Sequence, residues 1–180
     1  MIKTLILIAL FCGVMHASAA EMPGLKEGDR APDFTLATGG GEKVALATLL
    51  KQGPVALVFV RSADWCPFCR KQLQALQASL REIEATGVRV VALSYDAPDI
   101  NAAAVKKLGL AFPLLADEGS KVIDAYGVRN HEAKGRGAGI PHPVVFLVDP
   151  AGVIRVKLMR DNYRDRPESA EIIAGVKRLR

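Results

Sequence analysis

The chain has 180 residues, of which 50% are hydrophobic, and its formal net charge is +5 at pH 7. This length suits one compact domain with a sizeable core and leaves little room for two independent domains. The basic residues are spread along the chain, and a solvated loop accounts for the one local enrichment, HEAKGRG at 131–137. The composition therefore predicts neither nucleic-acid binding nor binding to a membrane surface.

The first twenty residues, MIKTLILIALFCGVMHASAA, have the features of a cleavable secretory signal. An early lysine precedes an apolar run over 5–15, and small residues follow in an A-x-A arrangement. We expect cleavage after Ala19 or Ala20, which leaves 21–180 as the exported domain, in the periplasm. The alternative is an uncleaved anchor, but a run of about 11 residues is shorter than the roughly 18 to 20 that span a bilayer.

Alternating apolar residues and a glycine run predict short edge strands joined by a turn over 30–47. A helical turn is predicted at 48–51. The segment PVALVFVRS, 54–62, is almost continuously apolar, which is typical of a strand buried on both faces. From Pro67 to Ala85, leucine and isoleucine recur at spacings of three and four, which predicts one long helix.

A second buried strand is predicted over 88–96, so strand, helix and strand form a right-handed parallel crossover. A helix follows over 99–109, with Asp99 as its candidate cap and Gly109 as its stop. The remaining predicted elements are a strand within 110–117, a short helix within 120–128, two strands around a DPAG turn over 143–159 and a terminal helix within 166–180, with Pro167 near its start. The pattern predicts one α/β domain whose first strands are parallel and whose final hairpin is antiparallel.

The segment SADWCPFCRKQL, 62–73, carries the two cysteines that remain once the predicted signal, with Cys12, is removed. Cys66 follows the first buried strand and begins the long helix, with Pro67 at a position suited to proline. There the free backbone N–H groups and the helix dipole favour a thiolate. Cys69 lies one turn further on, deeper and less acidic, so we predict an attacking thiol and a resolving thiol in an oxidising compartment.

Other uses of the pair are weaker explanations. A disulfide that closes so small a ring restrains the unfolded chain by only about 2 kcal/mol. A zinc site needs about four ligands, and the candidates beyond the cysteines, His131 and His142, have no ligand-like spacing. Reversible dithiol and disulfide chemistry is therefore favoured, with neither a metal nor a separate cofactor.

The motif WCPFC, between a buried strand and a helix, resembles the active site of the thioredoxin-like superfamily. The segment GDRAPDFTL, 28–36, is similar to one shared by its redoxin branches, which are the secreted cytochrome-maturation type and the alkyl hydroperoxide reductase/thiol-specific antioxidant (peroxiredoxin) type. PVVFLVDPAGVIR, 143–155, resembles their P-T-T-F-L-I-D-x-x-G-x-I segment. The resemblance implies a thioredoxin-like fold, a central mixed β-sheet flanked by helices, with an N-terminal extension and a central α/β insert.

The resemblance also implies that Pro143 is a cis-proline that faces the Cys66 sulfur and exposes backbone for substrate pairing. The residues themselves indicate only that a cis bond precedes a proline, so Pro141 is the alternative. His142, between the two prolines, is a candidate acid or base near the thiols or an exposed loop residue.

The peroxiredoxin motif is incomplete. Its Pro-x-x-x-Thr/Ser-x-x-Cys loop would require threonine or serine where this chain has Ala63 and proline where it has Phe59. Pro143 stands where the family's arginine precedes its strand, and Arg61 or Arg136 are the candidate substitutes. The motif therefore favours thiol–disulfide exchange over peroxide reduction.

The match to thioredoxins also has a gap, because Val60 stands where they hold a buried acid six residues before the first cysteine. Asp64 and His142 are candidate replacements, and Asp64 is equally explained as a turn residue that helps cap the helix. Trp65 is expected either to form a flat apolar wall for the substrate or simply to fill the core.

We therefore predict an exported thiol-disulfide oxidoreductase whose Cys66/Cys69 pair exchanges with disulfides of client proteins. A membrane or soluble thiol reductant would supply its electrons. The alternatives are a peroxiredoxin-like thiol peroxidase, with Cys66 peroxidatic and Cys69 resolving, and a non-catalytic binding protein.

Overall fold

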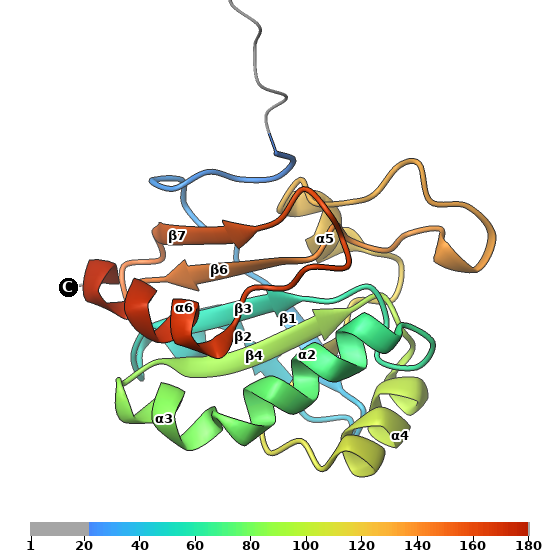
Figure 1. Cartoon of the computed structure of the whole chain (residues 1–180), viewed down its shortest axis with the longest axis horizontal. Coiled ribbons are helices and arrows are strands. Elements are labelled where there is room, and N and C mark those ends of the chain that lie inside the picture. Colours follow the sequence, from blue (N-terminus) through green and yellow to red (C-terminus); the bar gives the residue numbers. More distant parts are fainter. Residues whose placement is uncertain (1–21, 180) are drawn as a thin grey trace, which may run out of the picture.

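A seven-stranded mixed sheet forms the centre of the computed structural model, which describes residues 22–179 (Figure 1). The strand order is β2-β1-β5-β4-β3-β6-β7. The strands are β1 (Thr35–Thr38), β2 (Lys43–Ala45), β3 (Val55–Phe59), β4 (Arg89–Ser94), β5 (Leu114–Ala116), β6 (Val144–Val148) and β7 (Ile154–Met159). The helices are α1 (Leu46–Leu50), α2 (Pro67–Ala78), α3 (Leu80–Ala85), α4 (Pro98–Leu108), α5 (Lys121–Ala125) and α6 (Ser169–Gly175), with short 3-10 turns η1 (Gly135–Gly137) and η2 (Val176–Leu179).

The centre of the sheet is parallel, as predicted. Strand β4 pairs in parallel with both β3 and β5, and the helices α2, α3 and α4 make the crossovers. Strand β6 is antiparallel to β3 and to β7, so the predicted final hairpin is also confirmed. The N-terminal hairpin β1–β2 extends the sheet beyond β5, and α4, β5 and α5 form the expected insert between β4 and β6.

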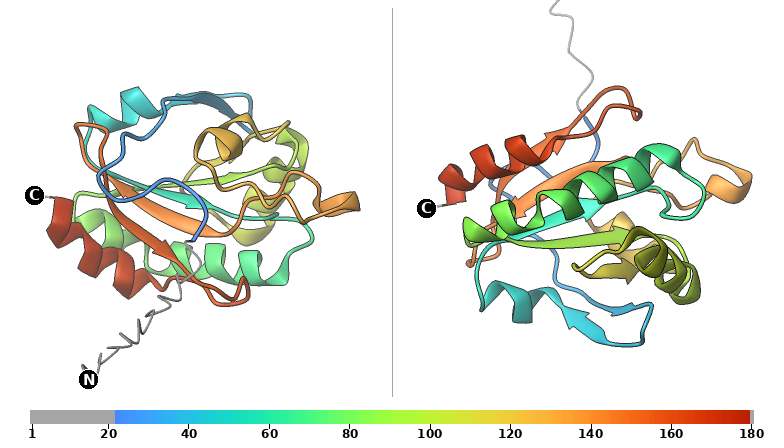
Figure 2. Two further views of the ribbon diagram at one scale, coloured as in Figure 1. Left: turned by 90° about the horizontal axis from the view of Figure 1, so that it is seen from above. Right: turned by 60° about the horizontal axis from the view of Figure 1, so that its bottom comes forward.

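Helices cover both faces of the sheet (Figure 2). Alternate side chains of β3 point to opposite faces, so Ala56 and Val58 join one core while Leu57 and Phe59 join the other. The first core also receives apolar side chains of α2, α3, α4 and α6, and the second receives those of α1 and α5. Because β3 is buried on both faces, the residues that follow it start from a rigid position.

Three details of the prediction are wrong. The long helix is two helices, because Ser79, with φ −97° and ψ 5°, leaves helical geometry between α2 and α3. Ala97, not Asp99, is the N-cap of α4, since Pro98 occupies its first turn and starts the helix earlier. Only β2 is an edge strand of the N-terminal pair, because β1 lies between β2 and β5.

The topology brings several loops to one edge of the sheet. The parallel strands β3 and β4 end there, and Val144 pairs with Phe59, so β6 begins there. Because Met159 pairs with Val144, β7 ends at the same edge, and residues 160–168 lead from it to α6. This segment lies against α2, where the rings of Tyr163 and Phe68 meet edge-on at 6.0 Å.

The predicted secretory signal, residues 1–20, lies outside the residues that the structure describes. Within 22–179, every helix is too short or too polar to cross a bilayer.

Leu73 provides a test of the packing of α2 on the sheet. Its side chain is fully buried in the first core, whereas its neighbour Gln74 is exposed. We expect Leu73→Ala to lower the free energy of unfolding by about 2 to 5 kcal/mol, because it leaves a cavity beneath the helix. The control, Gln74→Ala, should change it by no more than about 0.5 kcal/mol. Denaturant unfolding of both variants is the measurement, and equal effects would contradict the described burial.

Candidate active site

Cys66 lies where the chain passes from β3 into α2. It is the N-cap of α2, and Pro67 is the first helical residue, as the sequence predicts. The Cys66 Sγ accepts a hydrogen bond from the Cys69 backbone N–H, with 3.4 Å between sulfur and nitrogen. Both cysteines are free thiols, and their exposed fractions are only 1% for Cys66 and 0% for Cys69. The pair is thus a buried dithiol on the first turn of α2.

The surroundings of Cys66 lower the pKa of its thiol to about 6. The largest cause is a hydrogen bond from the Cys69 thiol, and the Cys69 backbone N–H and the charges of Arg166 and Arg61 act in the same direction. Burial opposes them but is outweighed. Hydrogen bonds to the charged form and nearby positive charges both stabilise a thiolate, so Cys66 is ionised at neutral pH.

Cys69 has the opposite character. Its pKa is raised, first because its thiol donates to the Cys66 sulfur, then because it is buried and lies beside the Cys66 charge. A backbone hydrogen bond from Ser62 and the charge of Arg166 counteract part of this rise. One proton is therefore shared unequally by two sulfurs, which is the behaviour of a coupled pair.

Arg166 is a site residue that the sequence analysis missed. Its Nη2 donates to the Cys69 Sγ at 3.6 Å, although the two residues are 97 positions apart. Its Nε is buried and has no hydrogen-bond partner within 22–179. The arginine reaches the thiols because the β6–β7 hairpin returns the chain to the edge of the sheet where α2 begins.

Asp96 is a second missed residue, and it holds the loop before Cys66. Its Oδ2 accepts the Ala63 backbone N–H at 2.9 Å, and burial raises the pKa of its carboxyl. The neighbouring Ser62 hydroxyl accepts the backbone N–H groups of Asp64 and Trp65, at 3.1 and 3.3 Å. The sequence held a clue to Asp96, because it follows β4 at the carboxyl edge of neighbouring parallel strands, where functional residues gather.

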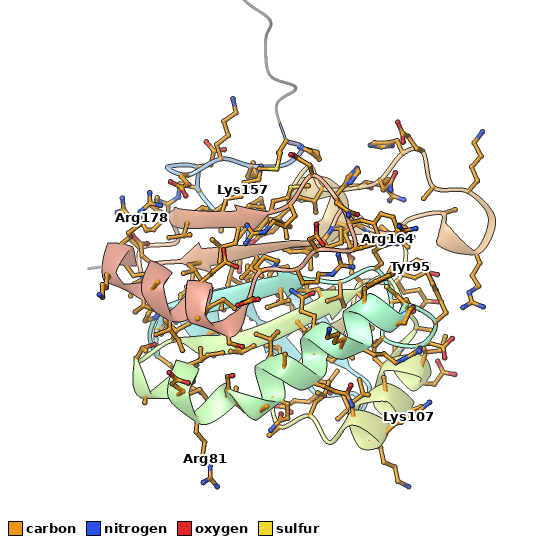
Figure 3. All side chains as sticks on the ribbon, viewed as in Figure 1. Arg81, Tyr95, Lys107, Lys157, Arg164 and Arg178 are labelled. Carbon is orange, nitrogen blue, oxygen red and sulfur yellow. The ribbon has the colours of Figure 1, made fainter. Side chains whose placement is uncertain are left out.

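Trp65 packs partly against the first core and also carries polar contacts. Its Nε1–H donates to the Tyr95 hydroxyl at 3.0 Å, which in turn donates to the Arg136 carbonyl at 2.5 Å. The guanidinium carbons of Arg61 and Arg136 lie 5.2 and 5.1 Å from its ring centroid. Figure 3 shows the labelled Tyr95 and Arg164 at this same end of the sheet, near the start of α2.

The expected cis-proline is wrong for both candidates, since 22–179 contain no cis peptide bond. The segment around Pro141 pairs with residues 128 and 129, which keeps its backbone extended. Arg129 and Pro141 form an isolated antiparallel bridge, and the His142 N–H donates to the Val128 carbonyl at 2.7 Å. Pro143 is buried directly before β6, at the edge of the sheet where β3 ends.

The remaining candidates have plainer surroundings. His142 is half-buried, and its pKa is lowered mainly by burial, while nearby Glu132 opposes this shift. Asp64 is exposed and does not occupy the N-cap, which is Cys66. Val60, Phe59 and Ala63 are buried apolar residues of the sheet and loop.

Within residues 22–179, no group of three or more histidine, cysteine or acidic side chains is placed to hold a metal ion. What the site offers is a stabilised thiolate, a protonated thiol one turn away and two arginines nearby. This arrangement can attack a sulfur or oxygen electrophile and then close a disulfide. The fold and the site together define a thioredoxin-like oxidoreductase that works through thiols.

Comparison with known families agrees with this class. The model of the AhpC/TSA family matches residues 27–157, and the chain belongs to that family.

Similar proteins include both thiol-disulfide oxidoreductases and peroxiredoxins. The chain is 28% identical to the thiol-disulfide oxidoreductase ResA of Bacillus subtilis (strain 168) over 159 residues. This alignment covers 85% of this chain and 80% of ResA. It is 34% identical to the peroxiredoxin Bcp of Escherichia coli (strain K12) over 134 residues, and this alignment covers 74% of this chain and 85% of Bcp.

Solved structures of other proteins share this fold. The peroxidoxin BcpB of Mycobacterium tuberculosis superposes with a TM-score of 0.76 at 24% identity, covering 89% of this chain and 99% of that one. A protein described as a putative disulfide isomerase, from Bacteroides thetaiotaomicron, gives 0.65 at 25% identity, covering 88% and 94%.

Arg166 provides a test of the thiolate's electrostatics. Because its charge lowers the pKa of Cys66, Arg166→Gln should raise that pKa from about 6 toward the ordinary thiol value of about 8.5. The rate of reaction with a small disulfide rises with pH as the thiolate forms, so its profile should shift to higher pH in the variant. The thiolate's ultraviolet absorbance, followed through a pH titration, is the direct measurement.

Lys71→Gln is the control for this test. It also removes one positive charge, but Lys71 lies on the exposed face of α2. It should leave the titration of Cys66 close to that of the wild type. Coincident titrations of Arg166→Gln and the wild type would contradict the role given to Arg166.

Proposed function

We propose that this protein is an exported thiol-disulfide oxidoreductase that reduces disulfides of client proteins through Cys66 and Cys69. The coupling of the two thiols is the observation that carries the proposal. The hydrogen bond from the Cys69 thiol to the Cys66 sulfur lowers the pKa of Cys66 and raises that of Cys69, so attack and resolution are assigned to different sulfurs. The similarity to ResA, a thiol-disulfide oxidoreductase, supports this assignment.

In the first step, the Cys66 thiolate attacks one sulfur of the client disulfide. A bond forms between the Cys66 Sγ and that sulfur, the client's S–S bond breaks, and the second client sulfur leaves as a thiolate. Arg61 and Arg166 place positive charge near the sulfurs among which the negative charge is redistributed.

In the second step, the loss of charge on Cys66 prepares Cys69. A neutral, disulfide-bonded Cys66 no longer accepts the Cys69 proton and no longer repels a second negative charge, so the two main electrostatic causes of the raised pKa disappear. The Ser62 backbone and Arg166 then stabilise the Cys69 thiolate. It attacks the Cys66 sulfur, the client leaves with two thiols after protonation, and the enzyme retains the Cys66–Cys69 disulfide.

Continued turnover requires a thiol reductant that returns two electrons to this disulfide. An oxidising compartment such as the periplasm would make a dedicated donor necessary, either a membrane thiol relay or a soluble reductant. The proposal of export rests on the sequence features of residues 1–20.

A thiol peroxidase is the second candidate, and the burial of Cys66 favours it. A sulfur in a residue with 1% exposure is more easily reached by a small peroxide than by a folded client. The Cys66 thiolate would take one oxygen from the peroxide, releasing an alcohol or water, and Cys69 would condense with the sulfenic acid to give the disulfide and water. The similarity to the peroxiredoxin Bcp supports this reading.

Replacing Cys69 tests whether Cys66 is the attacking thiol and Cys69 the resolving thiol. In Cys69→Ala, attack by Cys66 on a disulfide-bonded model protein should give a covalent adduct that persists, because no second thiol releases it. Mass spectrometry of the adduct is the measurement, and the Cys66→Ala variant, which keeps Cys69, is the control that should form none. Equal adduct formation in the two variants would contradict the assigned roles.

A comparison of oxidants separates the two candidates. We expect reduced wild-type protein to react with a small disulfide much faster than a free thiolate of the same pKa does, and with hydrogen peroxide only at about the free thiolate's rate. The reason is that the loop lacks the hydroxyl with which peroxiredoxins arrange peroxide, since Ala63 takes its place. Stopped-flow fluorescence of Trp65 follows both reactions. Peroxide oxidation faster than a free thiolate by orders of magnitude would favour the peroxidase instead.

A further inference from the structure

A shallow cavity beside the active site, the Trp65 pocket, has a volume of about 340 Å³. Arg61, Trp65, Lys134, Arg136 and Ile140 are its main lining residues. Trp65 directly precedes Cys66, and the charge of Arg61 is close enough to lower the pKa of the Cys66 thiol. A group bound in this pocket would therefore contact the residue that precedes Cys66.

The Trp65 pocket is positively charged. Arg61, Lys134 and Arg136 line it, and no lining residue carries a carboxylate. None of the three takes part in an ion pair within residues 22–179. Two acidic residues that neighbour the lining residues in sequence, Asp64 and Glu132, do not line it themselves. Asp64 lines a separate cavity against α4, and the charge of Glu132 acts on His142.

The two guanidinium groups of the pocket lie against aromatic rings. The guanidinium carbon of Arg136 lies 5.1 Å from the Trp65 ring centroid, and that of Arg61 lies 5.2 Å from it and 4.4 Å from the Tyr163 ring centroid. A guanidinium that lies over an aromatic ring can still donate N–H groups to a planar anion. The Arg61 Nε is buried and has no hydrogen-bond partner within 22–179. Charge-assisted, bidentate hydrogen bonds to a carboxylate are the contacts that such groups favour.

Hydrogen bonds fix the parts of the pocket relative to each other. Tyr95 accepts from the Trp65 indole and donates to the backbone of Arg136, so it ties the loop that carries Arg136 to the residue before Cys66. A binding group that is already ordered loses less entropy when it takes up a ligand.

We propose that the Trp65 pocket binds a carboxylate of the substrate, so that the enzyme prefers disulfides with carboxylate groups close to the sulfur that Cys66 attacks. This inference rests on the proposed exchange activity and names its substrate class. The bound carboxylate stays unchanged, and the reaction remains the transfer of two electrons from the Cys66 and Cys69 thiols to the substrate disulfide. The carboxylates belong either to a small-molecule disulfide or to acidic side chains beside a client's cysteine.

Two aromatic disulfides of different charge test the proposal. Dithiobis(nitrobenzoate) is a dianion and dithiodipyridine is neutral, and the measured quantity is the ratio of their rate constants with the reduced wild-type protein and its variants. Arg136→Gln should lower the anion-to-neutral ratio by about threefold to tenfold, because one of three positive charges is removed. Arg136 is chosen because its charge is not among the causes that lower the pKa of Cys66.

Arg81→Gln is the charge-matched control, since Arg81 is exposed on α3 and points away from the active site (Figure 3). Its ratio should equal that of the wild type. A ratio that falls equally in both variants, or in neither, would overturn the proposal. If the wild type fails to reduce even the neutral disulfide, the exchange activity itself is refuted.

Disulfide-linked peptides with either glutamate or glutamine beside the cysteine distinguish the two sources of the carboxylate. A glutamate preference that Arg136→Gln removes supports recognition of acidic client segments. A charge effect on the aromatic disulfides without one on the peptides supports a small-molecule substrate. The absence of both effects contradicts carboxylate recognition altogether.

Discussion

The hydrogen bond between the two thiols of a single helical turn is the interaction on which the chemistry of this protein depends. The Cys69 thiol donates to the Cys66 sulfur, and this contact is the largest cause of both the lowered pKa of one and the raised pKa of the other. The helix N-terminus contributes a backbone N–H to the same sulfur. A single geometric fact, the spacing of one turn at a helix start, therefore produces a nucleophile and keeps its partner protonated until the nucleophile has reacted.

The rest of the fold serves to hold that turn still. Strand β3 is buried on both faces, and the loop after it is fixed by Asp96 through Ala63 and by the Ser62 hydroxyl through two backbone N–H groups. Buried polar groups are costly unless they are hydrogen-bonded, so these contacts restrict the loop to few conformations. A thiolate in a buried residue needs such a frame, because its stabilising donors are effective only at hydrogen-bond distance.

The sequence predicts the parts of the site that are local and misses those that depend on the return of the chain. Periodicity and residue type over short windows predict that Cys66 lies at the start of a helix and that the strands around this helix are parallel. The contact of Arg166 with Cys69 depends on the register of the β6–β7 hairpin, which no local pattern encodes. Even so, the predicted hairpin implied that residues after 159 return to the active-site edge. The break at Ser79 was missed because the apolar spacing continues through it and only the backbone angles change.

The choice between disulfide and peroxide chemistry depends on hydroxyl groups more than on charge. Arg61 and Arg166 stabilise a thiolate and a departing anion equally well in either reaction, so their presence does not separate the two. Breaking an O–O bond is aided by a hydroxyl that orients the peroxide oxygen, and the position for it holds Ala63, whose backbone is engaged by Asp96. The adjacent Ser62 hydroxyl is fully buried and already accepts two backbone N–H groups. The proposal of disulfide exchange rather than peroxide reduction therefore depends on this loop, where Ala63 has no hydroxyl and the Ser62 hydroxyl is already engaged.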